Sequence, residues 1–333
     1  MNRLYDARGN RYRVVGPDVA RSLGVAVPPT PARAAAAVAS WARQAIDAFC
    51  RTPDQAPAAK PFISDGLLVG PFETTPPFNV LIVNTDASLA ERSGNGLTIF
   101  VTALKDEGLA PDGAFDLHVH HGAAAPTTTV AELGHEDGSA GVWLSMGAPG
   151  FGPEAVGARP GASAVAAFEG AACSRVAALA ALDARWTASQ FVRIGNPHCV
   201  TLLESAENLP SWEALHAEPL HGGLKAIADP GGGVCPAGVN LQWAARIGPN
   251  RLAARVFERG EGPTRSSGTS AVAVAAAALH LGLVEGPRVQ IVMPGGTAPV
   301  IGAIGPGGLL DMRLFGVADL LSLPSGDPAK DTP

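Results

Sequence analysis

Two serines stand at matching points of the sequence, and their surroundings suggest chemistry beside a bound carboxylate. Ser93 begins the segment Ser-Gly-Asn-Gly and Ser267 begins Ser-Gly-Thr-Ser, each at the expected start of a helix. The free N–H groups of a first helical turn and the helix dipole together bind carboxylates, and glycine lets a ligand approach the backbone closely. A side chain at such a point is therefore placed to exchange a proton with the carbon next to the carboxylate.

The duplication of this segment favours proton chemistry over helix capping alone. Serine is among the best N-caps, so a single Ser-Gly motif predicts no more than a helix start. Here Asn84 stands nine residues before Ser93, Glu258 stands nine residues before Ser267, and the two serines are 174 residues apart. This spacing is too long for a solenoid repeat and suits two related halves of one chain.

The composition sets limits on the class of protein. A length of 333 residues suits two domains of ordinary size. Hydrophobic residues make up 47%, charged residues 16%, and the net charge is -6, which indicates a globular protein without a nucleic-acid or anionic-membrane partner. The four cysteines are scattered, which argues against a disulfide framework or a zinc site. Without an apolar leader or a run long enough to cross a bilayer, the sequence predicts a cytoplasmic protein.

The elements that position the two serines are expected to be mainly strands. Residues 78–83 and 252–257 form apolar runs that are typical of buried strands, and one run precedes each serine. Residues 3–15 predict a hairpin with its turn at a Gly-Asn pair. A helix is expected to begin at Pro31 and to continue to about residue 51.

Taken together, these motifs resemble the diaminopimelate epimerase family. The first family signature, Asn-x-Asp-Gly-Ser followed after four residues by Cys-Gly-Asn-Gly, is similar to residues 84–96. The second signature, Glu-Arg-Gly-x-Gly-x-Thr-x-x-Cys-Gly-Thr-Gly, is similar to residues 258–270. Between them lie a Gly-Asn-Pro-His segment at residues 195–198 and a Pro-x-x-x-Asn segment that ends at Asn240. The resemblance extends over nearly the whole chain in the family's order.

The resemblance implies an α+β fold of two pseudo-symmetric domains, each a barrel-like β-structure around a central helix. The expected halves are residues 1–120 with residues 305–333, and residues 121–304. The resemblance also implies an isomerase of the racemase or epimerase type that uses neither a cofactor nor a metal. Its expected partner is a small amino-acid-like substrate, and a homodimer is compatible with it.

The resemblance also assigns roles to individual residues. In the family, two cysteines at the positions of Ser93 and Ser267 form the acid/base pair. The substrate-binding positions correspond here to Asn10, Asn84, Gly94, Asn95, Asn196, His198, Asn240, Glu258, Arg259, Gly268 and Thr269. These residue types suit an amino acid, because arginine binds carboxylates bidentately and a glutamate accepts hydrogen bonds from an ammonium group.

The sequence departs from the family at several of these positions. A neutral serine is a far poorer base than a thiolate for an amino-acid α-proton. The family's Asp-Gln pair is Asp65-Gly66 here, Arg11 replaces an aspartate, and Ala87 and Ser270 stand where glycine is usual. These differences argue against a housekeeping role in diaminopimelate metabolism.

Three interpretations stay open at the level of sequence. The first is an isomerase for a different amino-acid-like substrate, in which a serine works with Asp65, Asp86, Glu258 or His198. The second is a homologue that binds an amino acid without converting it. The third is an inactive form of an epimerase in which both cysteines were changed to serine by engineering.

One further motif carries the residue types of a metal site. His118 and His120 are expected on the same face of a strand, as two ligands would be. The sequence places no third ligand beside them, and the family uses no metal. We therefore predict that no metal binds there.

Overall fold

The computed structural model describes residues 1–52, 61–122 and 125–321. The chain divides into two compact units, Met1–Leu144 with the segment from Phe315 onward, and Ser145–Leu314. Both boundaries fall later than the sequence predicted. The reason is that β7 (Thr127–Glu136) and β8 (Ser139–Gly147) continue the antiparallel pairing that begins at β6 (Ala114–Val119), so most of this meander stays with the first unit.

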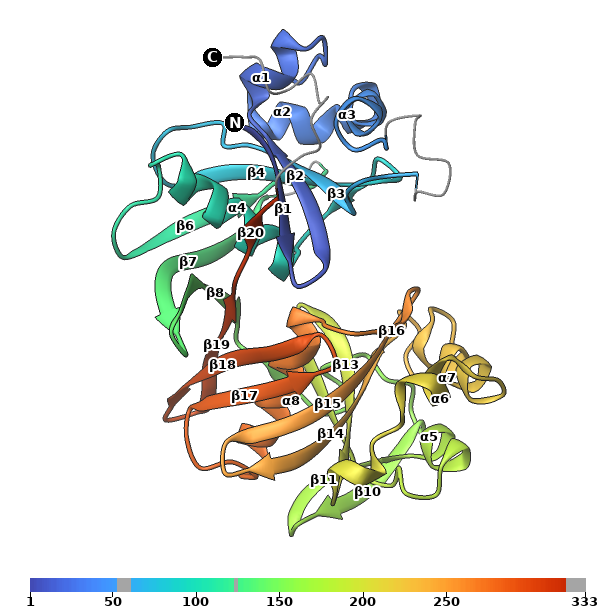
Figure 1. Cartoon of the computed structure of the whole chain (residues 1–333). Helices are drawn as coiled ribbons and strands as arrows, with labels where there is room; N and C mark the ends of the chain where they lie inside the picture. The colour runs from blue at the N-terminus through green and yellow to red at the C-terminus, as the bar shows by residue number, and fades with distance from the viewer. Residues whose placement is uncertain (53–60, 123–124, 322–333) are drawn as a thin grey trace. The chain divides into compact units, whose positions relative to one another are not determined.

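The first unit is a mixed sheet with one central helix. Its other strands are β1 (Asn2–Ala7), β2 (Asn10–Val15), β3 (Gly66–Val69), β4 (Phe78–Asn84), β5 (Leu89–Ala90) and β20 (Asp319–Leu320). The pairings run β20-β1-β2-β3-β4-β6-β7-β8, with β2 parallel to β3 and β4 parallel to β6 (Figure 1). Helix α4 (Gly94–Asp106) packs against β1 and β2.

The single helix predicted from Pro31 to about residue 51 is wrong. The chain forms α1 (Pro17–Ser22), α2 (Pro31–Ala36), the 3-10 turn η1 (Val38–Ser40) and α3 (Ala42–Phe49). The break falls at Trp41, whose φ of -137° is not helical. Leaving the helix lets the indole become buried and donate a hydrogen bond to the Ala34 carbonyl at 2.9 Å. Burial of this large ring outweighs the few helical bonds that are lost.

The second unit carries the longer strands. They are β9 (Gly150–Phe151), β10 (Ser163–Phe168), β11 (Ala171–Val176), β12 (Ser189–Ile194), β13 (Asn196–Leu203), β14 (Asn240–Gly248), β15 (Arg251–Glu258), β16 (Gly262–Thr264), β17 (Arg288–Met293), β18 (Gly296–Gly305) and β19 (Gly308–Gly316). The helical segments are α5 (Ala177–Leu182), η2 (Ala206–Asn208), α6 (Trp212–His216), α7 (Leu220–Ala228) and α8 (Gly268–His280). Figure 1 shows α8 beside the orange and red strands β15, β17 and β18.

The internal repeat predicted from the sequence is confirmed in the strand pairings. The order β12-β13-β14-β15-β17-β18-β19 reproduces β1-β2-β3-β4-β6-β7-β8, including both parallel pairs and the short side strand, β16 or β5. Both central helices have thirteen residues. The backbone angles at Ser93 are φ -146° and ψ 117°, and those at Ser267 are φ -145° and ψ 119°. The two units are therefore copies of one architecture.

The central helix of the second unit, α8, is enclosed by strands of its own unit. In α8 every residue from Ser270 to Ala278 is buried, which is typical of a helix surrounded on all sides. Small alanine side chains let the strands pack close to its axis. None of the helices in the described part of the chain has the length and apolar character needed to span a membrane.

Candidate active site

Ser93 is the N-cap of α4, as predicted. Its hydroxyl accepts a hydrogen bond from the Gly96 N–H at 3.0 Å. Gly94 and Asn95 form the first turn of the helix, where backbone N–H groups have no partner within the helix. This end of α4 thus offers a hydroxyl and backbone donors to an anionic group.

Tyr12 also lies at Ser93, and the sequence reasoning missed it. The tyrosine is buried on β2, near enough to Ser93 for the serine side chain to affect its pKa. The pKa of Tyr12 is raised, mainly by burial; the nearby Ser93 side chain partly opposes the rise, and the charge of Asp65 adds to it. Two features of the sequence could have indicated Tyr12. It is a tyrosine two residues after Asn10, and the family's glutamine is replaced by Gly66.

Gly66 explains how the tyrosine ring fits. Tyr12 and Gly66 are partners in the parallel pairing of β2 and β3. A β-carbon at Gly66 would lie 2.7 Å from Tyr12 Cε1 and 2.7 Å from the Val83 carbonyl oxygen. The space that a side chain would need is filled by the phenol ring.

We expect Gly66→Ala to lower the free energy of unfolding by about 1–3 kcal/mol. The Val83 carbonyl belongs to the β3–β4 ladder and cannot retreat freely, so the tyrosine ring has to shift. Urea denaturation measures the change. Gly233→Ala is the control, because its added methyl meets no atom within 4 Å and the residue has no positive φ. Equal stability of the two variants would contradict the tight contact.

Asp65 organises the start of β2. Its Oδ2 accepts hydrogen bonds from Asn10 Nδ2 at 3.1 Å and from the Arg11 N–H at 2.8 Å. The Arg11 side chain instead bonds Asp6, with Nε 3.0 Å from Oδ2. The predicted site residue Asn10 is thus held by a carboxylate, and the non-family Arg11 is engaged within the hairpin.

Asn84 and Asp86 form a compact turn before α4. Asn84 Nδ2 donates to Ser88 Oγ at 2.9 Å, and Ser88 Oγ donates to Asp86 Oδ1 at 2.6 Å. The hydrogen bonds from Ser88 lower the pKa of Asp86. Ala87 has a φ of 71°, a backbone conformation that glycine adopts without strain. Asp86 therefore serves the turn, and the family's usual glycine would suit position 87 better.

Ser267, the N-cap of α8, is paired with a carboxylate. Its hydroxyl donates to Glu258 Oε1 at 2.7 Å, while the bond that it accepts from the Ser270 N–H is long, at 3.4 Å. Burial raises the pKa of Glu258, and the hydrogen bond from Ser267 partly opposes this rise. The second serine thus has a proton acceptor already at its hydroxyl.

Arg259 connects two of the predicted asparagines. Its backbone N–H donates to Asn240 Oδ1 at 3.0 Å, and its Nη2 donates to Asn196 Oδ1 at 3.1 Å. A further bond joins Nη1 to the Ala237 carbonyl at 2.6 Å. The structure therefore brings Asn196, Asn240 and Arg259 together in the second unit, beside the turn that carries Glu258.

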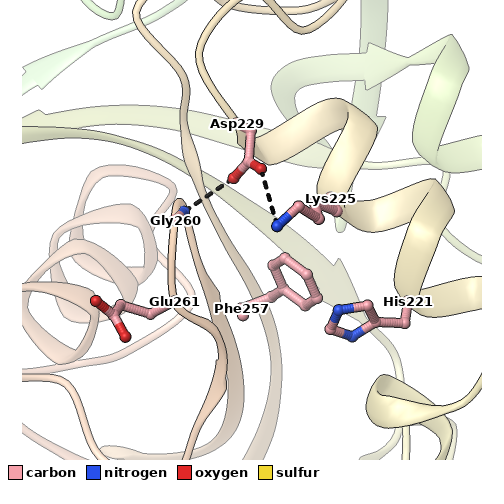
Figure 2. A pocket seen from close by; sticks show the side chains of 7 residues that line it. His221, Lys225, Asp229, Phe257, Gly260 and Glu261 are labelled. Carbon is pink, nitrogen blue, oxygen red and sulfur yellow. Dashed lines mark hydrogen bonds and ion pairs between the residues drawn. The ribbon is translucent and has the colours of Figure 1, made fainter.

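A small pocket lies behind this turn, on the side of α7 (Figure 2). Asp229 accepts a hydrogen bond from the Gly260 N–H at 2.8 Å and forms an ion pair with Lys225, 3.5 Å away. The His221 ring packs against the Phe257 ring with 5.3 Å between centroids. None of the predicted site residues lines this pocket. Its polar groups hold the turn in place.

His198 is fully buried beside the start of α8. Gln242 Nε2 is 3.0 Å from His198 Nδ1 and also donates to Ser270 Oγ at 3.0 Å. Burial, followed by the charge of Arg259, lowers the pKa of His198 to about 3. The histidine is therefore neutral near pH 7. Ser270, where the family usually has glycine, extends this network with its hydroxyl.

Two histidines just after β6 are engaged in local hydrogen bonds. His120 Nε2 lies 2.6 Å from Asn79 Oδ1, and His121 Nε2 lies 2.9 Å from Thr127 Oγ1. Within the described ranges, no group of three or more His, Cys, Asp or Glu side chains is arranged to hold a metal ion. The His118–His120 motif thus finds no third ligand there.

Sequence comparisons identify relatives of this architecture. The model of the diaminopimelate epimerase family matches residues 190–301. Diaminopimelate epimerase 2 of a Nostoc species is 30% identical over 234 residues, which cover 70% of this chain and 72% of that protein. Diaminopimelate epimerase of Streptomyces coelicolor is 31% identical over 194 residues, 58% of this chain and 53% of the relative.

Solved structures show the same fold at low sequence identity. A phenazine biosynthesis protein of the PhzF family from Bacillus anthracis aligns over 96% of both chains with a TM-score of 0.55 and 13% identity. A hydroxyproline epimerase from Agrobacterium vitis, with bound trans-4-hydroxy-L-proline, aligns over 96% of this chain and 88% of its own with a TM-score of 0.53 and 15% identity. The two-domain α+β fold predicted from the sequence is confirmed.

Proposed function

Because the chain belongs to the diaminopimelate epimerase family, we propose that it is a cofactor-independent isomerase that moves the α-proton of an amino-acid-like substrate. The observation that carries this proposal is the 2.7 Å hydrogen bond from Ser267 to Glu258. A serine at the family's cysteine position is too weak a base by itself. A carboxylate at its hydroxyl supplies the missing proton acceptor.

The proposed proton transfer involves the α-carbon of the substrate, the Ser267 hydroxyl and the Glu258 carboxylate. The α-carbon gives its proton to Ser267 Oγ while the Ser267 proton moves to Glu258 Oε1. The raised pKa of Glu258 makes the carboxylate a stronger base than an ordinary glutamate, since catalytic bases work best when their pKa approaches the working pH. The first-turn N–H groups at Gly268 and Thr269 hold the substrate carboxylate.

The surroundings of the serines also bear on the substrate. Asn196, Asn240 and Arg259 already form one polar group, which suits the ammonium and carboxylate groups of an amino acid. At Gly66 the family's glutamine is absent and the Tyr12 ring occupies its space. Diaminopimelate would therefore lose a contact at this position. We infer a substrate other than diaminopimelate.

The assembly and the place of action stay predictions. We expect a small-molecule substrate and no nucleic-acid or membrane partner, as the acidic composition indicates. A cytoplasmic location and a homodimer follow only from the resemblance and the sequence.

Solvent deuterium exchange tests the proposal. The protein is incubated in heavy water with LL-diaminopimelate, L-proline and trans-4-hydroxy-L-proline, and α-deuterium is measured by mass spectrometry. We expect incorporation into at least one of the cyclic amino acids, faster than into diaminopimelate. Heat-denatured protein is the control.

Calorimetry with the same three amino acids separates the alternatives. An amino acid that binds without gaining deuterium would identify a binding protein and contradict the isomerase. If none of the three amino acids binds or exchanges its α-proton, the proposed substrate class is contradicted.

A further inference from the structure

The turn that carries Glu258 is closed by a long hydrogen bond. It follows β15, and the cross-strand partner of Glu258 is Gly262 at the start of β16. The bond across the turn, from the Glu261 N–H to the Glu258 carbonyl, is 3.3 Å long. Gly260 and Gly262 have φ values of 81° and 84°, and glycine has more backbone freedom than any other residue. Contacts from outside the turn are therefore expected to fix where Glu258 lies.

Asp229 supplies such a contact. Its Oδ1 accepts a hydrogen bond from the Gly260 N–H at 2.8 Å, and its Oδ2 forms an ion pair with Lys225 Nζ at 3.5 Å (Figure 2). A hydrogen bond from a backbone N–H to a carboxylate is charge-assisted, and such bonds are roughly twice as strong as those between neutral groups. The bond joins the tip of the turn to the end of α7.

Helix α7 is itself packed against the strand that leads into the turn. Asp229 is the C-cap of this helix, and its own N–H donates to the Lys225 carbonyl at 3.0 Å. The His221 ring, also on α7, packs against the ring of Phe257, the residue before Glu258. Asp229 therefore reaches the turn from an element whose place relative to β15 is fixed by packing.

The first unit holds its corresponding turn in an equivalent way. Arg43 on α3 donates from Nη1 to the Thr85 carbonyl at 3.1 Å and from Nη2 to the Asp86 carbonyl at 2.8 Å. Along the chain, α3 lies between β2 and β3 as α7 lies between β13 and β14, and these strand pairs correspond in the repeat. In each unit, a charged residue from the inserted helices thus holds the backbone of the turn before the serine.

We propose that Asp229 is a positioning residue for proton transfer at Ser267, because it holds the turn that places the Glu258 carboxylate at the serine hydroxyl. This inference rests on the isomerase function proposed above. Asp229 touches no substrate group and exchanges no proton, and it acts on Glu258 through the Gly260 N–H. Every group that the inference needs belongs to the second unit.

Asp229→Ala removes the bond to Gly260 and keeps the backbone bonds of α7. We expect the kcat of α-deuterium exchange to fall by about 10- to 10²-fold, since a misplacement of about 1 Å can cost that much. KM should stay within about threefold of wild type, because Arg259 keeps its own bonds to Asn196 and Asn240. Initial rates in heavy water, with L-proline and trans-4-hydroxy-L-proline at several concentrations, measure both.

Asp229→Asn separates the hydrogen bond from the charge. The amide oxygen can still accept from the Gly260 N–H, whereas the ion pair with Lys225 is lost. Because exposed ion pairs contribute little, we expect kcat to return to within about threefold of wild type. Lys225→Met also breaks the ion pair and leaves the bond between Asp229 and Gly260, so its kcat should lie in the same range.

Asp183→Ala is the matched control in the same unit. Asp183 is the C-cap of α5, as Asp229 is the C-cap of α7. Its carboxylate also combines a backbone N–H with a basic side chain, since it accepts from the N–H of Arg185 at 2.9 Å and from Nε of the same arginine at 3.0 Å. These bonds join residues two positions apart, so their loss should leave kcat and KM unchanged.

The Gly260 amide can be observed without substrate. The sequence has two arginine–glycine steps, which end at Gly9 and Gly260, so ¹³C-carbonyl arginine with ¹⁵N-glycine labels two linked amides, and Arg8→Lys assigns them. Asp229→Ala should shift the Gly260 resonance and speed the exchange of its proton with solvent, while Asp229→Asn keeps the proton protected. The Gly9 N–H bonds the Asp6 carboxylate and should stay unchanged. The remaining ¹⁵N-glycine amides report that the variants are folded.

The outcomes separate this inference from the function on which it rests. Wild-type protein that exchanges no α-proton of the three amino acids would contradict the proposed function, and the positioning role would fall with it. With an active wild type, an unchanged kcat in Asp229→Ala would overturn the positioning role alone. An unmoved Gly260 resonance in Asp229→Ala would overturn it as well, and so would Asp229→Asn protein that protects the Gly260 amide yet is as slow as Asp229→Ala.

Discussion

We expect Glu258→Gln to lower α-deuterium exchange by about 10²–10⁴-fold, as for the loss of a general base, and to keep the fold. The glutamine carbonyl can still accept the hydrogen bond from Ser267, but it cannot take the serine's proton. The defect should therefore appear in kcat more than in KM. Mass spectrometry of the α-position in heavy water, at several substrate concentrations, measures both.

The same variant should be more stable than wild type at pH 7. The folded state raises the pKa of Glu258 above its unfolded value of about 4.3. The protonated carboxyl is therefore favoured by folding at low pH, and this contribution is lost as the pH rises through the folded pKa. At pH 7 the ionised, partly buried carboxylate opposes folding. We expect a gain on the order of 1 kcal/mol in the free energy of unfolding at pH 7 and none near pH 3.

Glu261→Gln is the matched control for charge. Glu261 is exposed, lies three residues further along the same turn, and raises the pKa of Glu258 by its charge. Its loss should keep the exchange rate and move the acidic limb of the pH profile slightly lower. That limb reports Glu258, because exchange is lost as the pH falls through the raised pKa. Glu258→Gln with wild-type exchange would contradict the role of the Ser267–Glu258 pair.

The double variant Ser93→Cys, Ser267→Cys should raise α-proton exchange, by at least about tenfold on the best substrate. A thiol has a pKa of about 8.5, which a helix N-terminus lowers further, so each site gains a base that ionises near neutral pH. Both serines already have the backbone angles of helix N-caps, and a thiol adds little volume. Initial rates of deuterium incorporation measure the gain.

A cysteine at a different helix start controls for general thiol reactivity. Ser211 is the exposed N-cap of the short helix α6, where its hydroxyl accepts from the Ala214 N–H at 3.1 Å. Ser211→Cys should leave the exchange rate unchanged. A folded double variant that is no faster than wild type would argue that the substrate does not lie at the serines as it does at the family's cysteines.

The repeat and the helix starts could be predicted from sequence because their signals are local. The glycines and the upstream polar residues lie close to Ser93 and Ser267 in the sequence. The two segments can therefore be recognised as copies without a structure. The contact between Ser267 and Glu258 could also be predicted, because only nine residues separate them in the sequence. The strand runs before the serines were equally clear from their apolar residues.

The features that were missed depend on contacts between distant segments. Tyr12 lies against Gly66 because β2 and β3 pair in parallel, although Gly66 is 54 residues further along the chain. The break at Trp41 depends on a buried space for an indole, which helical periodicity does not reveal. The late boundary at Leu144 follows from strand pairing across β6, β7 and β8, which a composition shift does not mark.

The return of the chain end to the first unit has a consequence for synthesis. β20 pairs with β1, and the Leu321 N–H donates to the Leu4 carbonyl at 2.8 Å. The second unit is a continuous segment, whereas the first begins with the first residue and receives its last strand near the end of the chain. A growing polypeptide can therefore complete the later-made unit first, while the earlier one waits with an open sheet edge. The sheet edge at β1 is closed only after β20 has been made, which is later than the whole of the second unit.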